Sequence, residues 1–228
     1  MTTAEKLKRQ KEIQSIIKDL ESQRNEKNLA GMARFGIETS KAFGIKLPVL
    51  RNMAKQYKKD HDLALALWET GYHEARLLAI FIDDPKKVTE QQMESWISDF
   101  NSWDICDQAT ALFDKTPYAV PKVFEWAERQ PEFEKRAAFA MIAWMAVHLK
   151  KETNQFFLDF LPLIENHSCD ERNYVKKAVN WALRQIGKRN KELNKLALNS
   201  AYAIFKKDCK SAKWIARDAI RELEGKFD

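Results

Sequence analysis

The sequence predicts an all-α fold built from repeated antiparallel helix pairs, and three observations support this prediction. Glycine and proline are scarce, with 6 of each in 228 residues, so few positions interrupt a helix. Apolar residues recur at helical spacing through most of the chain. A basic residue followed by an apolar, alanine-rich segment also returns at regular intervals.

The first predicted element is a surface helix near the N-terminus. Ile13, Ile16, Ile17 and Leu20 fall at i, i+3, i+4 and i+7, which gives one apolar stripe on a charged helix. We expect residues 1–27 to cap one end of the fold. The same segment holds no apolar run, so it predicts neither a signal peptide nor a membrane anchor.

Further helical patterns follow one another, and no convincing strand lies between them. The breaks contain residues typical of turns between antiparallel helices, such as Gly71, Pro85 and Pro117. No linker is long enough to divide the chain, so we expect a single domain over residues 1–228. The predicted helices span residues 48–59, 61–70, 73–83, 89–100, 102–114, 118–129, 133–150, 153–165, 171–188, 191–207 and 211–224.

A weak internal repeat sets the expected architecture. Arg76, Arg136, Lys177 and Arg217 each precede an apolar, alanine-rich segment, and the last two intervals are 41 and 40 residues. Periods near 40 residues are typical of HEAT-like helix pairs, which stack into a curved α-α solenoid. The alternative is chance recurrence in a lysine-rich helical chain.

Charge and cysteine content narrow the partners and the compartment. The chain has 39 basic and 33 acidic residues, and its net charge of +6 suits an anionic partner such as nucleic acid. Cys106, Cys169 and Cys209 are odd in number and far apart, so they predict neither a disulfide framework nor a metal site. A reducing cytoplasm is the expected compartment.

Several kinds of enzyme are disfavoured by missing motifs. The sequence has no Gly-rich phosphate loop, no His-Glu-x-x-His and no Cys-x-x-Cys. Its histidines, His61, His73, His148 and His167, are scattered without evident partners. We therefore expect no metal and no organic cofactor.

The helix predicted at 171–188 places a tryptophan on its polar face. Trp181 points away from the apolar side, and Lys177, Arg184 and Lys188 lie beside it at offsets of −4, +3 and +7. An indole within a basic stripe predicts a surface that binds phosphates. The apolar side consists of Val175, Val179, Ala182, Leu183 and Ile186.

The helix predicted at 102–114 has a second tryptophan on its polar face. Trp103 and Asp107 lie one turn apart there, and the same face carries Thr110 and Asp114. An ordinary interpretation remains open for each residue alone, with Trp103 packed under a loop and Asp107 a solvated charge. The apolar side consists of Ile105, Cys106, Ala109, Leu112 and Phe113.

The helix predicted at 133–150 is apolar nearly all round, so it should be central. Arg136, near its start, is the exception. Its guanidinium could reach a phosphate, or it could pair with Asp104 or Asp107. Both roles remain open.

Three separated motifs resemble the DNA alkylation repair glycosylases of the AlkD type, which are HEAT-like solenoids. They are Ser-Trp-Asp-Ile-Cys-Asp at 102–107, Lys-Arg-Ala-Ala at 135–138 and Lys-Lys-Ala-Val-Asn-Trp-Ala-Leu-Arg at 176–184. The likeness extends upstream through Met-Ala-Arg-Phe at 32–35 and Phe-Gly-Ile-Lys-Leu-Pro-Val-Leu-Arg at 43–51. It covers most of the chain in the expected order.

The resemblance implies roles for the residues on the two polar faces. It makes Trp103, Asp107 and Trp181 the catalytic set, and it makes Arg136 and Arg184 contacts to DNA. We expect the remaining basic residues of these faces to bind phosphates as well: Lys177, Lys188, Lys213 and Arg217. The chain departs from the family where Asp104 replaces a second tryptophan and Phe35 replaces a tyrosine.

The predicted function is that of a monomeric DNA glycosylase acting on double-stranded DNA with alkylated bases. It would hydrolyse the bond between deoxyribose and a cationic N3- or N7-alkylated purine, leaving an abasic site. Asp107 would stabilise the oxocarbenium-like sugar and orient water. Trp103 and Trp181 would attract the cationic base, by about 0.5–2 kcal/mol each.

Two alternatives remain. The chain could be a non-catalytic HEAT-like module that binds structured DNA or an acidic partner, or it could be a protein scaffold without nucleic acid. A carboxylate between outward tryptophans favours the glycosylase, since pure phosphate binding does not need Asp107 and would be weakened by its repulsion.

Overall fold

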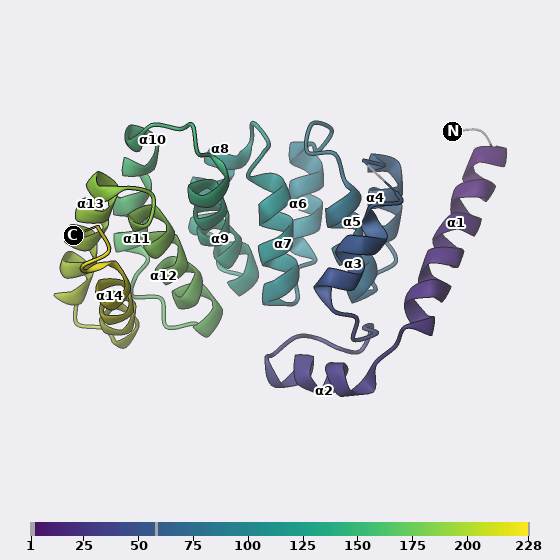
Figure 1. The fold of residues 1–228 in the computed structure, drawn as a ribbon, viewed down its shortest axis with the longest axis horizontal. Coiled ribbons are helices and arrows are strands. Elements are labelled where there is room, and N and C mark those ends of the chain that lie inside the picture. Colours follow the sequence, from purple (N-terminus) through teal and green to yellow (C-terminus); the bar gives the residue numbers. More distant parts are fainter. Residues whose placement is uncertain (1–2, 58, 228) are drawn as a thin grey trace. The chain divides into compact units, whose positions relative to one another are not determined.

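A computed structural model describes residues 3–57 and 59–227, and within these ranges it contains helices and no strand (Figure 1). This confirms the all-α prediction. Across the described residues, every helix is too short or too polar to span a lipid bilayer. The helices are α1 (Thr3–Ser22), α2 (Glu26–Arg34), α3 (Leu47–Ala54), α4 (His61–Trp68), α5 (His73–Ile82), α6 (Glu90–Ser98), α7 (Trp103–Phe113), α8 (Ala119–Ala127), α9 (Glu132–His148), α10 (Asn154–Leu158), α11 (Phe160–Asn166), α12 (Asn173–Gly187), α13 (Lys191–Phe205) and α14 (Lys210–Leu223).

Three differences between the observed and the predicted helices exceed two residues. Helix α2 was not expected, although Asn25 caps it by accepting a hydrogen bond from the backbone N–H of Asn28 at 3.0 Å. The helix predicted at 153–165 divides into α10 and α11 at Asp159. The helix predicted at 48–59 ends at Ala54 as α3, and residue 58 lies outside the described residues.

The chain divides into two compact units, Met1–Met93 and Glu94–Asp228. A single domain over 1–228 stays a prediction. The capping role of residues 1–27 also stays a prediction, and residues 1–2 of that segment lie outside the described part. Helix α1 ends at Ser22.

In the first unit, α5 packs against α3 and α4, and it holds a loop through a buried carboxylate. The Glu74 side chain is fully buried, and it accepts hydrogen bonds from the backbone N–H groups of Phe43, Gly44 and Ile45 at 2.8, 2.7 and 3.1 Å. Gly44 has φ +79°, and a Cβ there would meet the Asn25 carbonyl oxygen at 2.4 Å. Glycine is therefore required at this turn.

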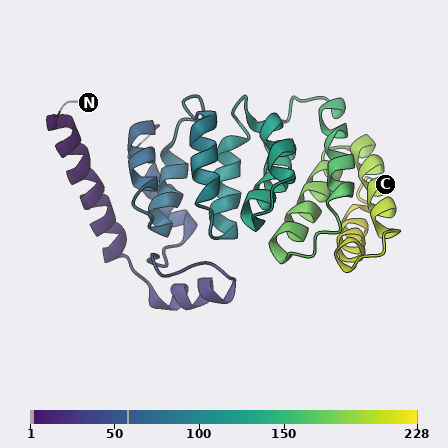
Figure 2. The ribbon, with the colours of Figure 1, turned by 180° about the vertical axis from the view of Figure 1, so that it is seen from behind.

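In the second unit, the helices form two layers. Helices α7, α9, α12 and α14 pack on one another in that order, while α8 packs on α9 and α13 packs on both α12 and α14 (Figure 2). Consecutive members of the first layer carry Arg136, Lys177 and Arg217, as the repeat predicts. Helix α9 is buried along most of its length, which confirms its predicted central place.

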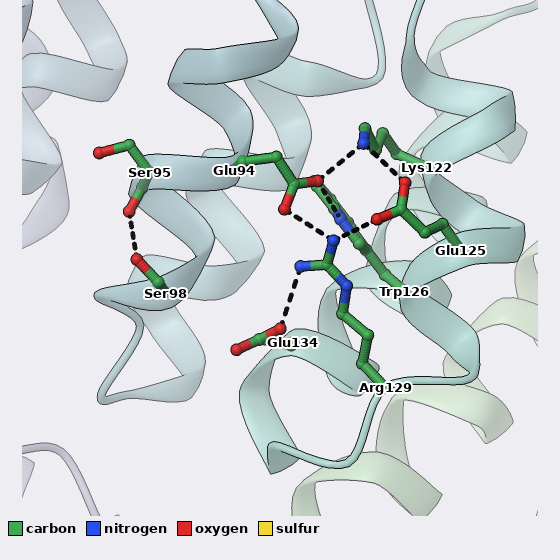
Figure 3. Close-up of polar contacts among 8 residues, drawn as sticks. All are labelled: Glu94, Ser95, Ser98, Lys122, Glu125, Trp126, Arg129 and Glu134. Atoms are coloured by element: carbon green, nitrogen blue, oxygen red, sulfur yellow. Dashed lines mark hydrogen bonds and ion pairs between the residues drawn. The ribbon is translucent and has the colours of Figure 1, made fainter.

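A polar network ties three helices of the second unit together (Figure 3). Glu94 of α6 accepts a hydrogen bond from Trp126 at 2.9 Å and pairs with Lys122 at 2.8 Å and Arg129 at 2.7 Å, all in or just after α8. Arg129 also pairs with Glu134 of α9 at 3.1 Å. Burial alone would raise the pKa of Glu94, but its three partners hold that pKa below the ordinary value.

A disulfide joins two loops of the second unit, contrary to the prediction from cysteine spacing. Cys169, before α12, is bonded to Cys209, before α14, with Cα atoms 5.7 Å apart. The two residues are 40 positions apart, so they occupy equivalent places in successive repeats. Only Cys106 is a free thiol, and it is buried. The argument for a reducing cytoplasm thus loses its premise, and the compartment stays a prediction.

Candidate active site

The polar face of α7 is covered by α9 rather than by solvent. Asp107, Thr110 and Asp114 are 9%, 0% and 3% exposed, so the polar face is buried and the interpretation of Asp107 as a solvated charge is wrong. The reason is that α9 supplies polar partners opposite them: Arg136 meets Asp107, and His148 Nδ1 lies 2.5 Å from Asp114 Oδ2. The predicted apolar side of α7 is buried as expected.

Asp107 and Arg136 form a bidentate ion pair. The guanidinium donates from Nε to Oδ1 at 2.9 Å and from Nη2 to Oδ2 at 2.8 Å. Its Nη1 donates to the Tyr174 carbonyl oxygen at 2.7 Å, and Arg136 is only 6% exposed. Of its two open roles, pairing with Asp107 is therefore the one observed. Direct contact with a phosphate stays a prediction that this geometry disfavours.

Burial and the ion pair have opposite effects on the pKa of Asp107. Burial raises the pKa of Asp107 above its ordinary value, although Arg136 opposes the shift. Two hydrogen bonds use only part of the acceptor capacity of a carboxylate. The Asp107 side chain is also 13% exposed, so a small part of it is accessible to solvent.

Trp144 of α9 completes the site, and the sequence did not single it out. Its indole N–H donates to the Asp107 carbonyl oxygen at 2.7 Å, and its ring meets the Trp181 ring edge to face at 5.3 Å. The His148 ring stacks on the Trp144 ring, with the ring centroids 4.9 Å apart. Helix α9 looked uniformly apolar, but Trp144 lies two turns after Arg136 on the same broad face, which is the signal that could have identified it.

The two predicted tryptophans are half-buried, as expected for residues outside the core. Trp103 begins α7 one turn before Asp107, and Trp181 of α12 is linked to Asp107 through Trp144. The structure thus connects Asp107, Arg136, Trp144 and Trp181 by direct contacts. The predicted apolar side of α12 is fully buried.

Two members of the predicted basic stripe are neutralised by α14. Arg184 pairs with Glu222 and, at 3.3 Å, with Asp218, while Lys188 pairs with Glu222 as well. Lys177 is solvent-exposed. These carboxylates lie one repeat further along the chain, so a helical wheel drawn for α12 alone does not include them.

The other predicted phosphate contacts, Lys213 and Arg217, lie near Phe205. Lys213 Nζ donates to the Phe205 carbonyl oxygen at 2.7 Å and lies 5.0 Å from its ring, and the Arg217 guanidinium lies 5.8 Å from the same ring. Arg217 is exposed and Lys213 is half-buried. Both residues belong to α14, which packs on α12 and α13, whereas Asp107 and Arg136 belong to α7 and α9.

The cluster has the elements of a site for a cation. A buried carboxylate favours positive charge nearby, and half-exposed indoles attract cations through their ring faces. Within residues 3–57 and 59–227, no group of three or more His, Cys, Asp or Glu side chains is arranged to hold a metal ion.

Comparison with known proteins identifies the fold and the family. The chain is similar to a solved structure described as "a new family of proteins related to the HEAT-like repeat DNA glycosylases with affinity for branched DNA structures". The two share a TM-score of 0.78 and 19% sequence identity, over 95% of this chain and 97% of the other, which confirms the HEAT-like repeat fold. A search of curated proteins finds no match. The family model of the DNA alkylation repair enzymes matches residues 16–223, and the chain therefore belongs to that family.

Proposed function

We propose that this protein is a DNA glycosylase that excises cationic N3- or N7-alkylated purines from double-stranded DNA. The observation that carries the proposal is the buried Asp107 carboxylate, paired with Arg136 and connected through Trp144 to the half-exposed Trp181. The alkylated purine is already cationic, so it leaves without a general acid. What the protein must supply is stabilisation of the positive charge that develops on the sugar.

Asp107 is suited to that task. A preorganised charge in a site with little water stabilises a developing opposite charge more strongly than it would in solvent. Arg136 fixes both carboxylate oxygens, so little reorganisation is needed during the reaction. A carboxylate that accepts two hydrogen bonds has capacity left, so Asp107 can also accept a hydrogen bond from the attacking water, as acidic residues do in glycoside hydrolysis.

Trp103 and Trp181 are suited to select the base. Each indole face attracts a cation by about 0.5–2 kcal/mol, and neutral bases gain less. The edge-to-face contact with Trp144 holds the Trp181 ring in place before the base arrives. Lys177 and Arg217, which are exposed, would bind the phosphates.

A second candidate is a non-catalytic module that binds structured DNA. Two observations favour it: both oxygens of Asp107 are occupied by Arg136, and the similar solved structure is described as having affinity for branched DNA. Excision separates the candidates, since a binding module releases no base.

The experiment compares Asp107→Asn with the wild-type protein on methylated duplex DNA, with chromatographic detection of the freed bases. The variant should release no measurable 7-methylguanine, while its affinity for undamaged duplex changes little. Glu94→Gln is the matched control, because it also neutralises a carboxylate held by cations in the same unit. It should keep excision activity at temperatures where both variants remain folded.

Full excision by Asp107→Asn would refute the role of Asp107. Release of neither 3-methyladenine nor 7-methylguanine by the wild-type protein would refute the glycosylase and favour the binding module. Asp107→Glu is the control for misfolding of Asp107→Asn. It keeps the negative charge and the pairing with Arg136 but moves the carboxylate. It should retain part of the activity.

A further inference from the structure

A basic hollow lies along α14. It has a volume of about 550 Å³ and is lined by Lys210, Lys213, Trp214, Arg217, Asp218 and Arg221. This volume is within the range of sites for small organic ligands. The lining residues follow helical spacing, so they form one face of α14.

One exposed aromatic ring, Trp214, lines the hollow, and a second ring, Phe205, lies near two of its cations. Trp214 is 40% exposed, and Lys176 of α12 lies over its ring at 5.6 Å. Phe205 is 38% exposed, with Lys213 and Arg217 near its ring. Grooves that bind single-stranded nucleic acid combine such aromatic surfaces with positive charge.

The charge of the hollow favours a phosphate-bearing ligand. Four cations line it against one carboxylate. That carboxylate, Asp218, is already engaged by Asn180 at 2.7 Å and by Arg184 at 3.3 Å, and it also pairs with Arg221. Lys210 and Arg217 are exposed, so their charge faces solvent.

The aromatic surface decides which form of nucleic acid fits. Inside a duplex both faces of each base are covered by neighbouring bases, so away from the duplex ends only an unpaired base can stack on Trp214. We propose that this hollow binds an unpaired base of a DNA strand together with its flanking phosphates. The site rests on the proposed action on DNA, but it does not depend on base excision.

The test is binding of a fluorescently labelled ten-nucleotide oligothymidylate to the full chain, measured by anisotropy. Trp214→Ala should weaken binding by about 5- to 150-fold, the range for loss of one base stack. Trp214→Phe should retain most of the affinity, because it keeps an aromatic face. A blunt duplex of equal length should bind both variants as it binds the wild-type protein.

The phosphate contacts have a separate readout. The plot of log affinity against log salt concentration has a negative slope. Arg217→Gln and Arg221→Gln should each make that slope shallower by about 0.7. Lys195→Gln is the matched control, since Lys195 is an exposed cation on neighbouring α13 that does not line the hollow. It should leave the slope unchanged.

Three results would overturn the proposal. If Trp214→Ala binds oligothymidylate as tightly as the wild-type protein does, no base stacks on Trp214. If the variant loses as much affinity for the blunt duplex as for oligothymidylate, the hollow has no preference for an unpaired base. Equal affinity for thymidine monophosphate would make the hollow a nucleotide site. Failure of excision by the wild-type protein leaves these binding results standing, so the two proposals fail separately.

Discussion

Replacement of Arg136 by glutamine should destabilise the second unit more than the same replacement of an exposed arginine. The substitution removes both hydrogen bonds to Asp107 and the one to the Tyr174 carbonyl oxygen. Asp107 then remains buried with no cation beside it. Arg217→Gln is the control, because Arg217 lies on an exposed face.

The magnitude follows from the geometry of the pair. Removing one partner of a buried ion pair costs about 3–5 kcal/mol of unfolding free energy, because an uncompensated charge is left behind. Adding Asp107→Asn removes that charge. The double variant should therefore be more stable than Arg136→Gln alone, and the control should change by less than about 0.5 kcal/mol.

The loss should also depend on pH. Without Arg136, burial acts unopposed and raises the pKa of Asp107 further than in the wild-type protein. Between the unfolded and folded pKa values the folded state then binds more protons, so the free energy of unfolding falls as pH rises. Arg136→Gln should thus be less destabilised at pH 5 than at pH 8, and the double variant should lack this added dependence.

The assay is urea denaturation followed by circular dichroism, with the wild-type protein, both single variants and the double variant at each pH. A loss below about 1 kcal/mol for Arg136→Gln would refute the reasoning, because it would match an exposed pair rather than a buried one. So would an equal loss at both pH values.

Three further outcomes are expected. Excision should weaken toward acid at a pH above the ordinary aspartate pKa, since burial raises the pKa of Asp107 and its charged form is required; a single-turnover rate that stays constant down to pH 4 would contradict this. Trp181→Ala should slow release of 7-methylguanine by about 2- to 30-fold, from the loss of one cation–π contact, and should weaken binding to undamaged duplex less; equal losses would make Trp181 a binding residue only. Cys169→Ser with Cys209→Ser should lower the unfolding free energy by about 4 kcal/mol, for a closed loop of 40 residues; urea curves of the wild-type protein that do not respond to reductant would show that the bond does not form.

Periodicity predicted the helices and their apolar sides because both depend on one helix at a time. It placed Val175 and Val179 in the core correctly, and both are fully buried. It failed for Asp107 and Asp114, because a wheel drawn for α7 contains no information on what α9 brings against its polar face. Burial of a polar face is a property of two helices.

The repeat contained part of the missing information. Arg136 contacts Tyr174, Asn180 contacts Asp218 and Arg184 contacts Glu222, each at a separation of 38 residues. Cysteines 169 and 209 are joined at a separation of 40. Once a period near 40 is recognised, residues one period apart are candidates for contact. Composition alone treats the same residues as scattered.

The carboxylates of the second unit differ in how fully their charge is compensated. Glu222 is paired with two cations, Arg184 and Lys188. Burial would raise the pKa of Glu222, but the two cations outweigh it, so the pKa lies below the ordinary value. Asp107 has one cation, and its pKa stays above the ordinary value because burial dominates. An additional positive charge would therefore relieve more unfavourable energy at Asp107 than at Glu222. A sugar that becomes cationic during bond cleavage supplies such a charge only in the transition state, which is when stabilisation accelerates a reaction. We therefore propose that Asp107, rather than the more exposed carboxylates of α14, stabilises the charge on the sugar.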